Sequence, residues 1–520
     1  KNVWRYRDYV IRSLNDDKPY NRFVEEQIAG DELWPGDPDA LIATAFLRNG
    51  PWDGFAFDKK AQRNDFLTDV TDTTGSVFIG LTVGCARCHN HKYDPISQKD
   101  YYRFQSFFAA IQPADVPLPG ELPVALPPAK ADPAAKADPA TKVEGPAAFA
   151  VREDGAAAPK HFLLVRGDIY HPGDEVTPGF PSALAGSSSD AVVTAPAGGK
   201  STGRRSALAR WLASPDNPQT ARVMVDRVWQ YHFGAGIVGT PSDFGKNGER
   251  PSNPQLLDWL ASIFMAPDTS PEEPNCGWRL KKLHRLMMTS STYRQSTAGD
   301  AAGAKLDPED HLLWRMNRQR LEGEEIRDAI LAVSGRLNLK MGGPGVYPEV
   351  EKGVLDTGST HKWGDSPPAE RLRRTIYVFQ RRSVVLPIVD AFDGADSSGS
   401  CPRRAVTTIA PQALVLFNSA FTHEEAHFLA ERVAREAGLS PVAEVDRLYQ
   451  ITLGRHPRAV EVQECLEFLV RQARIHGKDL KQAVATTLAA TTTGHDPTAT
   501  AALDDLCHVL INTNEFVYLE

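Results

Sequence analysis

Residues 113–159 are rich in proline and alanine and contain the near-repeat "AKADPA" twice. A segment of this composition has too few apolar side chains to form a core, which predicts an extended linker. Short alternating apolar runs set off by Gly and Pro come after it and indicate a small β element. We therefore predict a helical region over 1–112, the linker over 113–159, a small β-rich element over 160–202 and a large, mainly helical domain over 203–520.

Length and composition indicate an ordinary globular protein. The chain has 520 residues, of which 42% are hydrophobic and 24% charged, enough for about three domains. The formal net charge is -8 and no Lys/Arg run alternates with aromatics, so nucleic acid is not expected as a partner. No apolar run approaches the ~20 residues of a membrane-spanning helix, so we expect no membrane span in this chain.

Capping residues predict a mainly α fold. Asn217, Pro218 and Gly234 have the positions of a cap, a first turn and a stop, and Ser97 is a second cap. Gly30, Gly50 and Gly84 read as helix stops. Further helices are predicted at 254–265, 278–290, 319–337, 420–437, 441–453, 459–475 and 500–512, and long loops at 338–372 and 390–411.

Residues 85–89 form a Cys-x-x-Cys-His motif, with Cys85, Cys88 and His89. This spacing lets two thiols bond to the vinyl groups of one haem, while the following histidine binds the iron. The motif therefore predicts one covalent haem c, held by Cys85 and Cys88, with His89 as an axial iron ligand.

Zinc is the rival interpretation, because Cys85, Cys88, His89 and His91 include the ligand types of zinc sites and of zinc-supported nucleases. A structural zinc site normally needs a second ligand pair, and neighbouring His89 and His91 could hardly close a tetrahedron with both thiols. A plain redox pair is disfavoured because the surrounding pattern is helical. The other cysteines are isolated, and pairing among them or free buried thiols both stay open: Cys276, Cys401, Cys465 and Cys507.

Four apolar residues after the motif share one helical face: Tyr101, Phe104, Phe108 and Ile111. We favour core packing for them. The pattern also allows them to wall a haem, which needs an apolar surround.

The sixth iron ligand decides between electron transfer and catalysis, because a strong ligand closes the iron to substrate. His232 is the distant candidate, although a lone histidine on an apolar face is more often a satisfied core residue.

On the same predicted helix Arg222, Asp226 and Gln230 share a face. They read as an Arg-Asp helix pair or, alternatively, as a polar binding groove.

Several long strings resemble one known family. Residues 78–111, "FIGLTVGCARCHNHKYDPISQKDYYRFQSFFAAI", and residues 204–234, "RRSALARWLASPDNPQTARVMVDRVWQYHFG", are similar to the large planctomycete-type cytochrome c proteins, which pair two domains of unknown function. The resemblance implies that 1–112 is the C-terminal half of the first domain and that the N-terminal part lies upstream. It also implies export from the cytoplasm, where c-type haem is not attached, hence a periplasmic, extracellular or cell-surface location.

From motif and resemblance together we expect an extracytoplasmic c-type haem protein that transfers single electrons, with a link to polysaccharide or sugar oxidation. The expected partner is a redox protein or another haem domain, and carbohydrate binding and oligomer formation are further expectations. Two alternatives stay open: a peroxidase-like oxidoreductase with an open iron site, and a surface or assembly protein whose haem is structural.

Overall fold

The computed structural model describes residues 2–51, 56–118, 146–185, 189–196, 198–270, 273–350, 363–381, 384–397, 399–438, 440–483 and 497–519. Helices dominate and the sheets are small, so the predicted mainly α class is confirmed. Within these residues no helix is both long and apolar enough to span a bilayer. The chain forms two compact units: unit 1 comprises Lys1–Asn317 and Ser398–Pro402, and unit 2 comprises Arg318–Ser397 and Arg403–Glu520.

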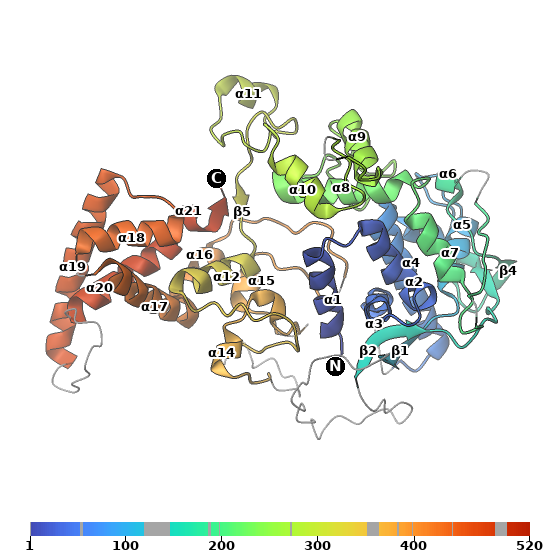
Figure 1. The fold of residues 1–520 in the computed structure, drawn as a ribbon, viewed down its shortest axis with the longest axis horizontal. Coiled ribbons are helices and arrows are strands. Elements are labelled where there is room, and N and C mark those ends of the chain that lie inside the picture. The colour runs from blue at the N-terminus through green and yellow to red at the C-terminus, as the bar shows by residue number, and fades with distance from the viewer. Residues whose placement is uncertain are drawn as a thin grey trace. The chain divides into compact units, whose positions relative to one another are not determined.

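Unit 1 is a group of helices (Figure 1) that pack around a large apolar core, with a second, smaller apolar cluster beside it. Helix α2 packs on α7, and α8 on α9. Its helices are α1 (Trp4–Asn15), α2 (Tyr20–Leu33), α3 (Pro38–Ala43), η1 (Thr44–Arg48), α4 (Lys59–Thr74), η2 (Gly75–Ile79), η3 (Val83–Arg87), α5 (Gln98–Gln105), η4 (Ser106–Phe108), η5 (Val165–Gly167), α6 (Ser182–Ala185), α7 (Arg204–Leu212), α8 (Pro218–Phe233), α9 (Pro254–Met265), α10 (Leu280–Met288) and α11 (Ala301–Leu306).

The predicted caps at Asn217 and Ser97 are confirmed. The Asn217 side chain accepts a hydrogen bond from Gln219 N, and α8 ends at Gly234 with φ 84°. Ser97 opens α5 with a reciprocal capping box to Asp100. These devices join residues two or three positions apart, which is why the sequence reveals them.

The predicted stop at Gly84 is wrong, and the predicted stop at Gly30 coincides with a kink in α2 rather than with its end. Helix α2 extends to Leu33, but its backbone leaves the helical conformation at Ala29, with φ -147° and ψ 30°. A Cβ at Gly30 would lie 2.0 Å from Ala40 O, so this glycine permits close approach of α3. The helical stretch before the motif ends at Ile79, where Gly80 takes a left-handed conformation with φ 60°. Gly84 lies inside η3 instead.

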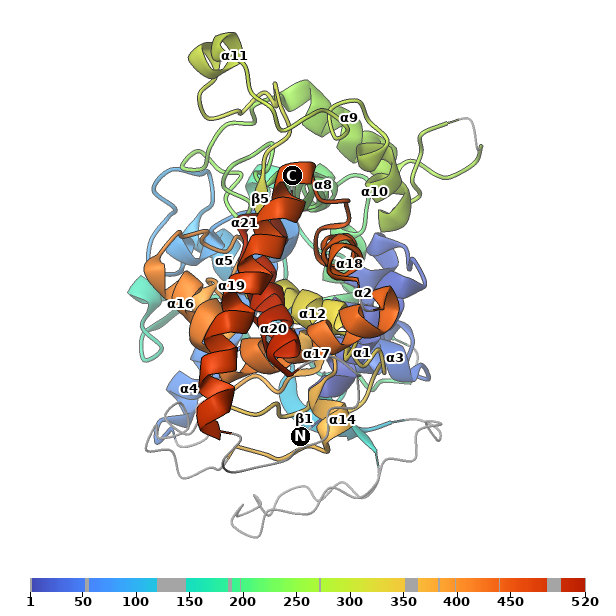
Figure 2. The ribbon, with the colours of Figure 1, turned by 90° about the vertical axis from the view of Figure 1, so that its left-hand side faces the viewer.

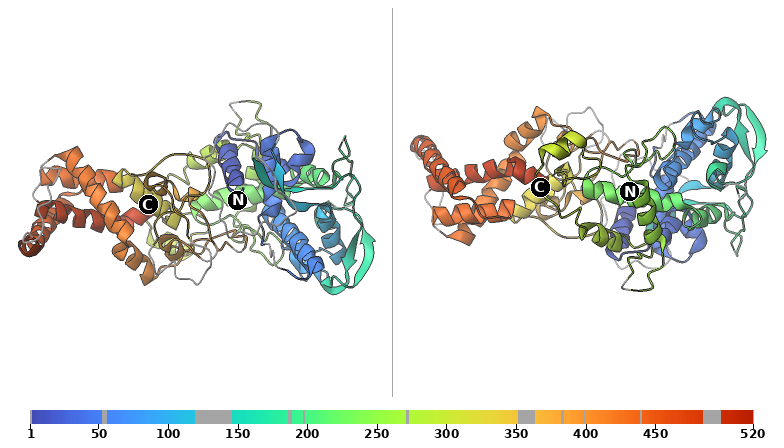
Figure 3. Two further views of the ribbon diagram at one scale, coloured as in Figure 1. Left: turned by 90° about the horizontal axis from the view of Figure 1, so that it is seen from below. Right: turned by 90° about the horizontal axis from the view of Figure 1, so that it is seen from above.

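Two hairpins lie at the edge of the helices of unit 1, cyan to teal in Figure 3. Strands β1 (Gln112–Pro117) and β2 (Ala147–Arg152) pair antiparallel, so paired strands occupy parts of the segment predicted as an extended linker. Its middle, 119–145, lies outside the described residues. Strands β3 (His161–Leu164) and β4 (Pro172–Val176) form the second hairpin, within the predicted small β element.

The compact units do not follow the predicted domain boundaries. Those boundaries place residues 1–112 and 203–317 in separate domains, yet both stretches belong to unit 1. Side chains from α2, α5 and α7 share its core, including Ile28, Phe104 and Leu208, each at most 1% exposed. Burial of this common apolar surface is the physical reason that the two stretches form one body.

Unit 2 is a helical unit in which α19 and α20 lie side by side and α20 also packs on α17 (Figure 2). The predicted helices 420–437 and 441–453 match α17 and α18, whereas 319–337 is shortened because Gln319 and Arg320 pair in a strand. Its elements are β5 (Gln319–Arg320), α12 (Gly323–Ser334), α14 (Pro368–Arg371), η7 (Thr375–Tyr377), α15 (Pro387–Ala391), α16 (Ala410–Asn418), α17 (Ala420–Ala437), α18 (Pro441–Leu453), α19 (Ala459–Ala483), α20 (Pro497–Ile511), α21 (Asn514–Val517) and β6 (Tyr518–Leu519).

Candidate functional site

The Cys-x-x-Cys-His motif lies on the short 3₁₀ helix η3 and the turn after it. Gly80 places the chain for this turn: its carbonyl accepts a hydrogen bond from Phe244 N at 2.7 Å, and a Cβ there would meet the Phe244 and Val223 side chains at 2.8 Å. The motif is therefore held between the end of the α4–η2 helical stretch and the start of α5.

Both motif thiols and the imidazole are accessible. Cys85, Cys88 and His89 are all exposed, whereas Val83 and Ala86 of the same turn are buried and anchor it. The Cys88 thiol lies against the β3–β4 hairpin, because a Cβ added to Gly167 would sit 2.8 Å from Cys88 Sγ. Gly167 has φ 76°, a left-handed conformation that favours glycine.

Hydrogen bonds to one carbonyl fix the turn. Arg87 O accepts from Gln98 Nε2 at 2.9 Å and from the Tyr102 hydroxyl at 3.0 Å. Gln98 Nε2 also donates to Leu164 O at 2.9 Å, which connects the motif with β3. Gln98 N in turn donates to Asn90 Oδ1 at 2.9 Å.

His89 has one ring nitrogen occupied by its own backbone neighbour. Its Nδ1 lies 2.6 Å from Asn90 O, a contact that requires the proton on Nδ1, since a carbonyl only accepts. This tautomer leaves the Nε2 lone pair available to a metal, an arrangement usual for histidine ligands. Exposed thiols and an imidazole with this orientation fit the donor set that a c-type haem requires.

His91 faces the protein interior rather than the motif. Its side chain is 3% exposed, and Nδ1 accepts hydrogen bonds from Asp94 N at 2.8 Å and Tyr93 N at 3.3 Å. Asp94 Oδ1 accepts from Lys246 N at 2.7 Å. Within the described ranges no three His, Cys, Asp or Glu side chains converge on a metal position, so the four-ligand zinc interpretation is not supported.

The aromatic face after the motif belongs to the core. Tyr101, Phe104, Phe108 and Ile111 are each at most 1% exposed, so they have no surface to offer a haem and the core-packing interpretation is confirmed.

A buried carboxyl lies beneath the motif. Burial raises the pKa of Asp72 to about 6, because its effect exceeds the lowering by the Tyr101 hydroxyl and the Arg87 charge. Asp72 Oδ2 lies 2.7 Å from the position of a Cβ on Gly84.

His232 has a histidine as its neighbour. Its Nε2 lies 2.8 Å from His284 Nδ1 on α10, and Tyr293 packs edge-on against its ring. Burial lowers the pKa of His232 and of His284. This environment is that of a half-buried structural histidine, and no described contact supports His232 as an iron ligand.

The polar face of α8 does not form the predicted Arg-Asp pair or a shared groove. Arg222 pairs with Asp258 of α9 at 2.7 Å. Asp226 is fully buried and accepts from Val238 N at 2.8 Å, and burial raises its pKa to about 6. Gln230 donates to Pro402 O, so the three residues serve three separate packing roles.

All six cysteines lie in described residues and none of them forms a disulfide. Outside the motif three are buried and Cys401 is exposed. Burial raises the pKa of Cys276 to about 11 and raises those of Cys465 and Cys507. Of the two possibilities left open by the sequence, disulfide pairing among these four cysteines is not observed.

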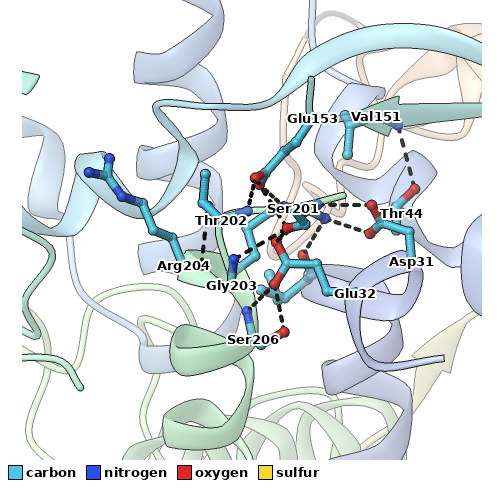
Figure 4. A network of polar contacts seen from close by, with 12 residues as sticks. Asp31, Glu32, Thr44, Val151, Glu153, Ser201, Thr202, Gly203, Arg204 and Ser206 are labelled. Atoms are coloured by element: carbon cyan, nitrogen blue, oxygen red, sulfur yellow. Dashed lines mark hydrogen bonds and ion pairs between the residues drawn. The ribbon is translucent and has the colours of Figure 1, made fainter. Parts of the chain in front are cut away.

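The sequence-based predictions do not include a buried ionic network, whose carboxylates Asp31, Glu32 and Glu153 are labelled in Figure 4 and whose cation is Arg205. The Arg205 guanidinium is 0% exposed and contacts the carboxylates of Asp31, Glu32 and Glu153 at 2.6, 3.2 and 3.0 Å. Glu32 also accepts from the hydroxyls of Ser201 and Ser206. A signal was present: Arg205 shares a helical face with Leu208 and Leu212, and a charge on an apolar face needs a buried partner.

Comparison with known proteins finds two matching family models. Residues 1–113 match PSCyt2, described as a protein of unknown function (DUF1549), and residues 204–469 match PSD1, described as a protein of unknown function (DUF1553). The second match therefore includes parts of both compact units. No curated protein and no solved structure matches the chain.

Proposed function

Because the chain belongs to the planctomycete-type cytochrome c proteins with paired PSCyt2 and PSD1 domains, we propose that it is an extracytoplasmic c-type haem protein that transfers single electrons. The observation that carries this proposal is the joint exposure of Cys85, Cys88 and His89 on one turn, with His89 Nδ1 directed to Asn90 O.

Each motif residue has a defined task in this proposal. The exposed thiols of Cys85 and Cys88 are accessible to the vinyl groups that form thioether bonds. His89 Nε2 would bind the haem iron, and Asn90 O, next to His89 Nδ1, fixes the tautomer that leaves Nε2 available. Bound haem would supply a one-electron couple.

The surrounding residues orient the turn. Gln98 and Tyr102 both donate to Arg87 O, so the short segment between the cysteines has little freedom to rotate. Gly167 leaves room beside Cys88 Sγ. An exposed motif also allows a partner protein to approach closely, which favours electron exchange over chemistry in an enclosed pocket.

The test is the visible spectrum of the chain, exported to the periplasm of a host that attaches c-type haem, before and after acid-acetone extraction. We expect retained pigment with sharp low-spin bands. Changing Cys85 and Cys88 to Ser should remove the covalent pigment, and His89→Ala should remove the low-spin bands. The matched control is Cys401→Ser, which changes another exposed thiol and should keep the spectrum.

The spectrum also separates the competing functions. A high-spin spectrum with retained pigment would favour the peroxidase-like oxidoreductase, because the iron would then be open to substrate. A colourless protein, or pigment that is unchanged in the double cysteine variant, would refute the proposal.

A further inference from the structure

A cavity of about 350 Å³ lies in unit 1 between α1, α2, α8 and α10. Its volume falls in the range of small-molecule sites, which are mostly apolar with a few polar groups that orient the ligand. The cavity shares no residue with the cysteine motif, so a ligand can bind in it whether or not the motif carries haem.

Aromatic rings from four elements line part of the wall: Tyr6, Tyr20, Phe23, Phe46 and Phe78. Phe46 and Phe78 contact each other with centroids 5.3 Å apart, and Tyr20 stacks on Phe23 at 6.2 Å. Phe78 and Tyr20 are 1% and 6% exposed and anchor the wall in the core, whereas Tyr6, Phe23 and Phe46 are only partly buried and offer ring surface to the cavity. Fixed flat faces of this kind favour a planar aromatic ligand.

Two hydrogen-bond donors line the same cavity. Gln27 is 4% exposed, and its Oε1 accepts from the Tyr6 hydroxyl. In the part of the chain that the structure describes, no acceptor takes a hydrogen bond from Gln27 Nε2. Lys18 also lines the cavity and is paired with Glu26, but an ammonium has three N–H donors and the pair uses one of them.

We propose that this cavity binds a planar aromatic molecule that carries an acceptor oxygen, either a carbonyl or a carboxylate. The ring body fills the space between the aromatic walls, and the oxygen accepts from Gln27 Nε2 and from Lys18 Nζ. A pure hydrocarbon of the same size leaves the buried Gln27 donor unpaired, which lowers its affinity.

The experiment is calorimetric titration of the intact chain with three probes of similar size: naphthoate, acetylnaphthalene and ethylnaphthalene. We expect saturable binding of naphthoate or acetylnaphthalene at least tenfold tighter than that of ethylnaphthalene, as one hydrogen bond implies. Which of the two binds tighter identifies the natural oxygen as carboxylate or carbonyl.

Two variants assign the binding to this cavity. Gln27→Leu should reduce the preference for the oxygen-bearing probes about tenfold and leave ethylnaphthalene unchanged. Met224→Trp places a large ring in the cavity and should abolish binding of all probes, whereas the matched control Leu306→Trp adds the same ring at an 86% exposed position and should not. Thermal unfolding checks that each variant is folded.

Three results would overturn the proposal. The first is no saturable binding of either oxygen-bearing probe. The second is equal affinity for all three probes. The third is unchanged binding in a folded Met224→Trp variant.

Discussion

Replacing Arg205 by methionine tests whether the buried ionic network joins α2, the end of β2 and α7. The substitution removes the guanidinium that donates to Asp31 at 2.6 and 2.9 Å and to Glu153 at 3.0 Å. It leaves the Glu32 and Glu153 carboxylates, 0% and 1% exposed, without their cation. Removing one partner of a buried ion pair costs about 3–5 kcal/mol.

The expected change in melting temperature depends on the size of unit 1. For roughly 300 residues at about 2.1 cal/mol/K each, a loss of about 3–5 kcal/mol lowers Tm by about 5–8 °C. Differential scanning calorimetry measures this value. The control is Arg222→Met, which removes an ion pair whose side chains are 31% and 58% exposed and should cost at most about 1 kcal/mol.

The pH dependence of the stability deficit, meaning the free energy of unfolding that Arg205→Met loses relative to the native chain, gives a second readout. In the native chain burial raises the pKa of Glu32. Burial acts in the same direction on Glu153, but the charge of Arg205 and hydrogen bonds from Thr202 together exceed it, so the pKa of Glu153 is lowered. Without Arg205 the folded-state pKa of both carboxyls rises, so both bind protons more readily when folded. The deficit should therefore be largest near pH 7 and shrink as the pH falls toward about 4. A deficit below about 1 kcal/mol, or one that grows on acidification, would refute this reasoning.

Three other predictions concern single positions in unit 1. Burial raises the pKa of Asp226 to about 6, so the free energy of unfolding should fall by about 3 kcal/mol as the pH rises from about 4 to about 6 and this carboxyl ionises. Chemical denaturation should show this fall in the native chain and not in Asp226→Asn, and an unchanged pH profile in the variant would contradict the prediction. Ser97→Ala removes the capping box of α5 and should lower the free energy of unfolding by about 1 kcal/mol in the same assay. The control is Ser76→Ala, which removes a partly exposed hydroxyl that donates to Thr73 O. Gly167→Ala adds a methyl group 2.8 Å from Cys88 Sγ at φ 76° and should cost about 1–3 kcal/mol; a neutral effect on Tm would show that the hairpin moves away from the thiol.

Local signals in the sequence predicted many helix boundaries. The bounds of α9, α17 and α18 agree with the predicted 254–265, 420–437 and 441–453, because caps, first-turn prolines and terminal glycines act within a few residues. The Cys-x-x-Cys-His motif is likewise local, and the structure leaves its three residues exposed on one turn.

Glycines marked the limit of this local reasoning. Gly30 resembles a helix stop in sequence and lies next to a kink at Ala29, but its lack of a Cβ also permits the approach of Ala40, which only the packed structure reveals. Local sequence also does not predict the burial of His91. Its ring accepts a hydrogen bond from Asp94 N, and Asp94 in turn accepts one from Lys246 N in a loop far along the chain.

The sequence by itself thus determined the helical class, the ends of several helices and the three motif residues, since each depends on neighbours a few positions away. Only the tertiary structure decided the pairing of β1 with β2, the extent of unit 1, the partners of Arg205 and the cavity beside Gln27. These features join residues that are tens to hundreds of positions apart. Their formation depends on burial of apolar surface and compensation of buried charge across the whole unit, which no local pattern encodes.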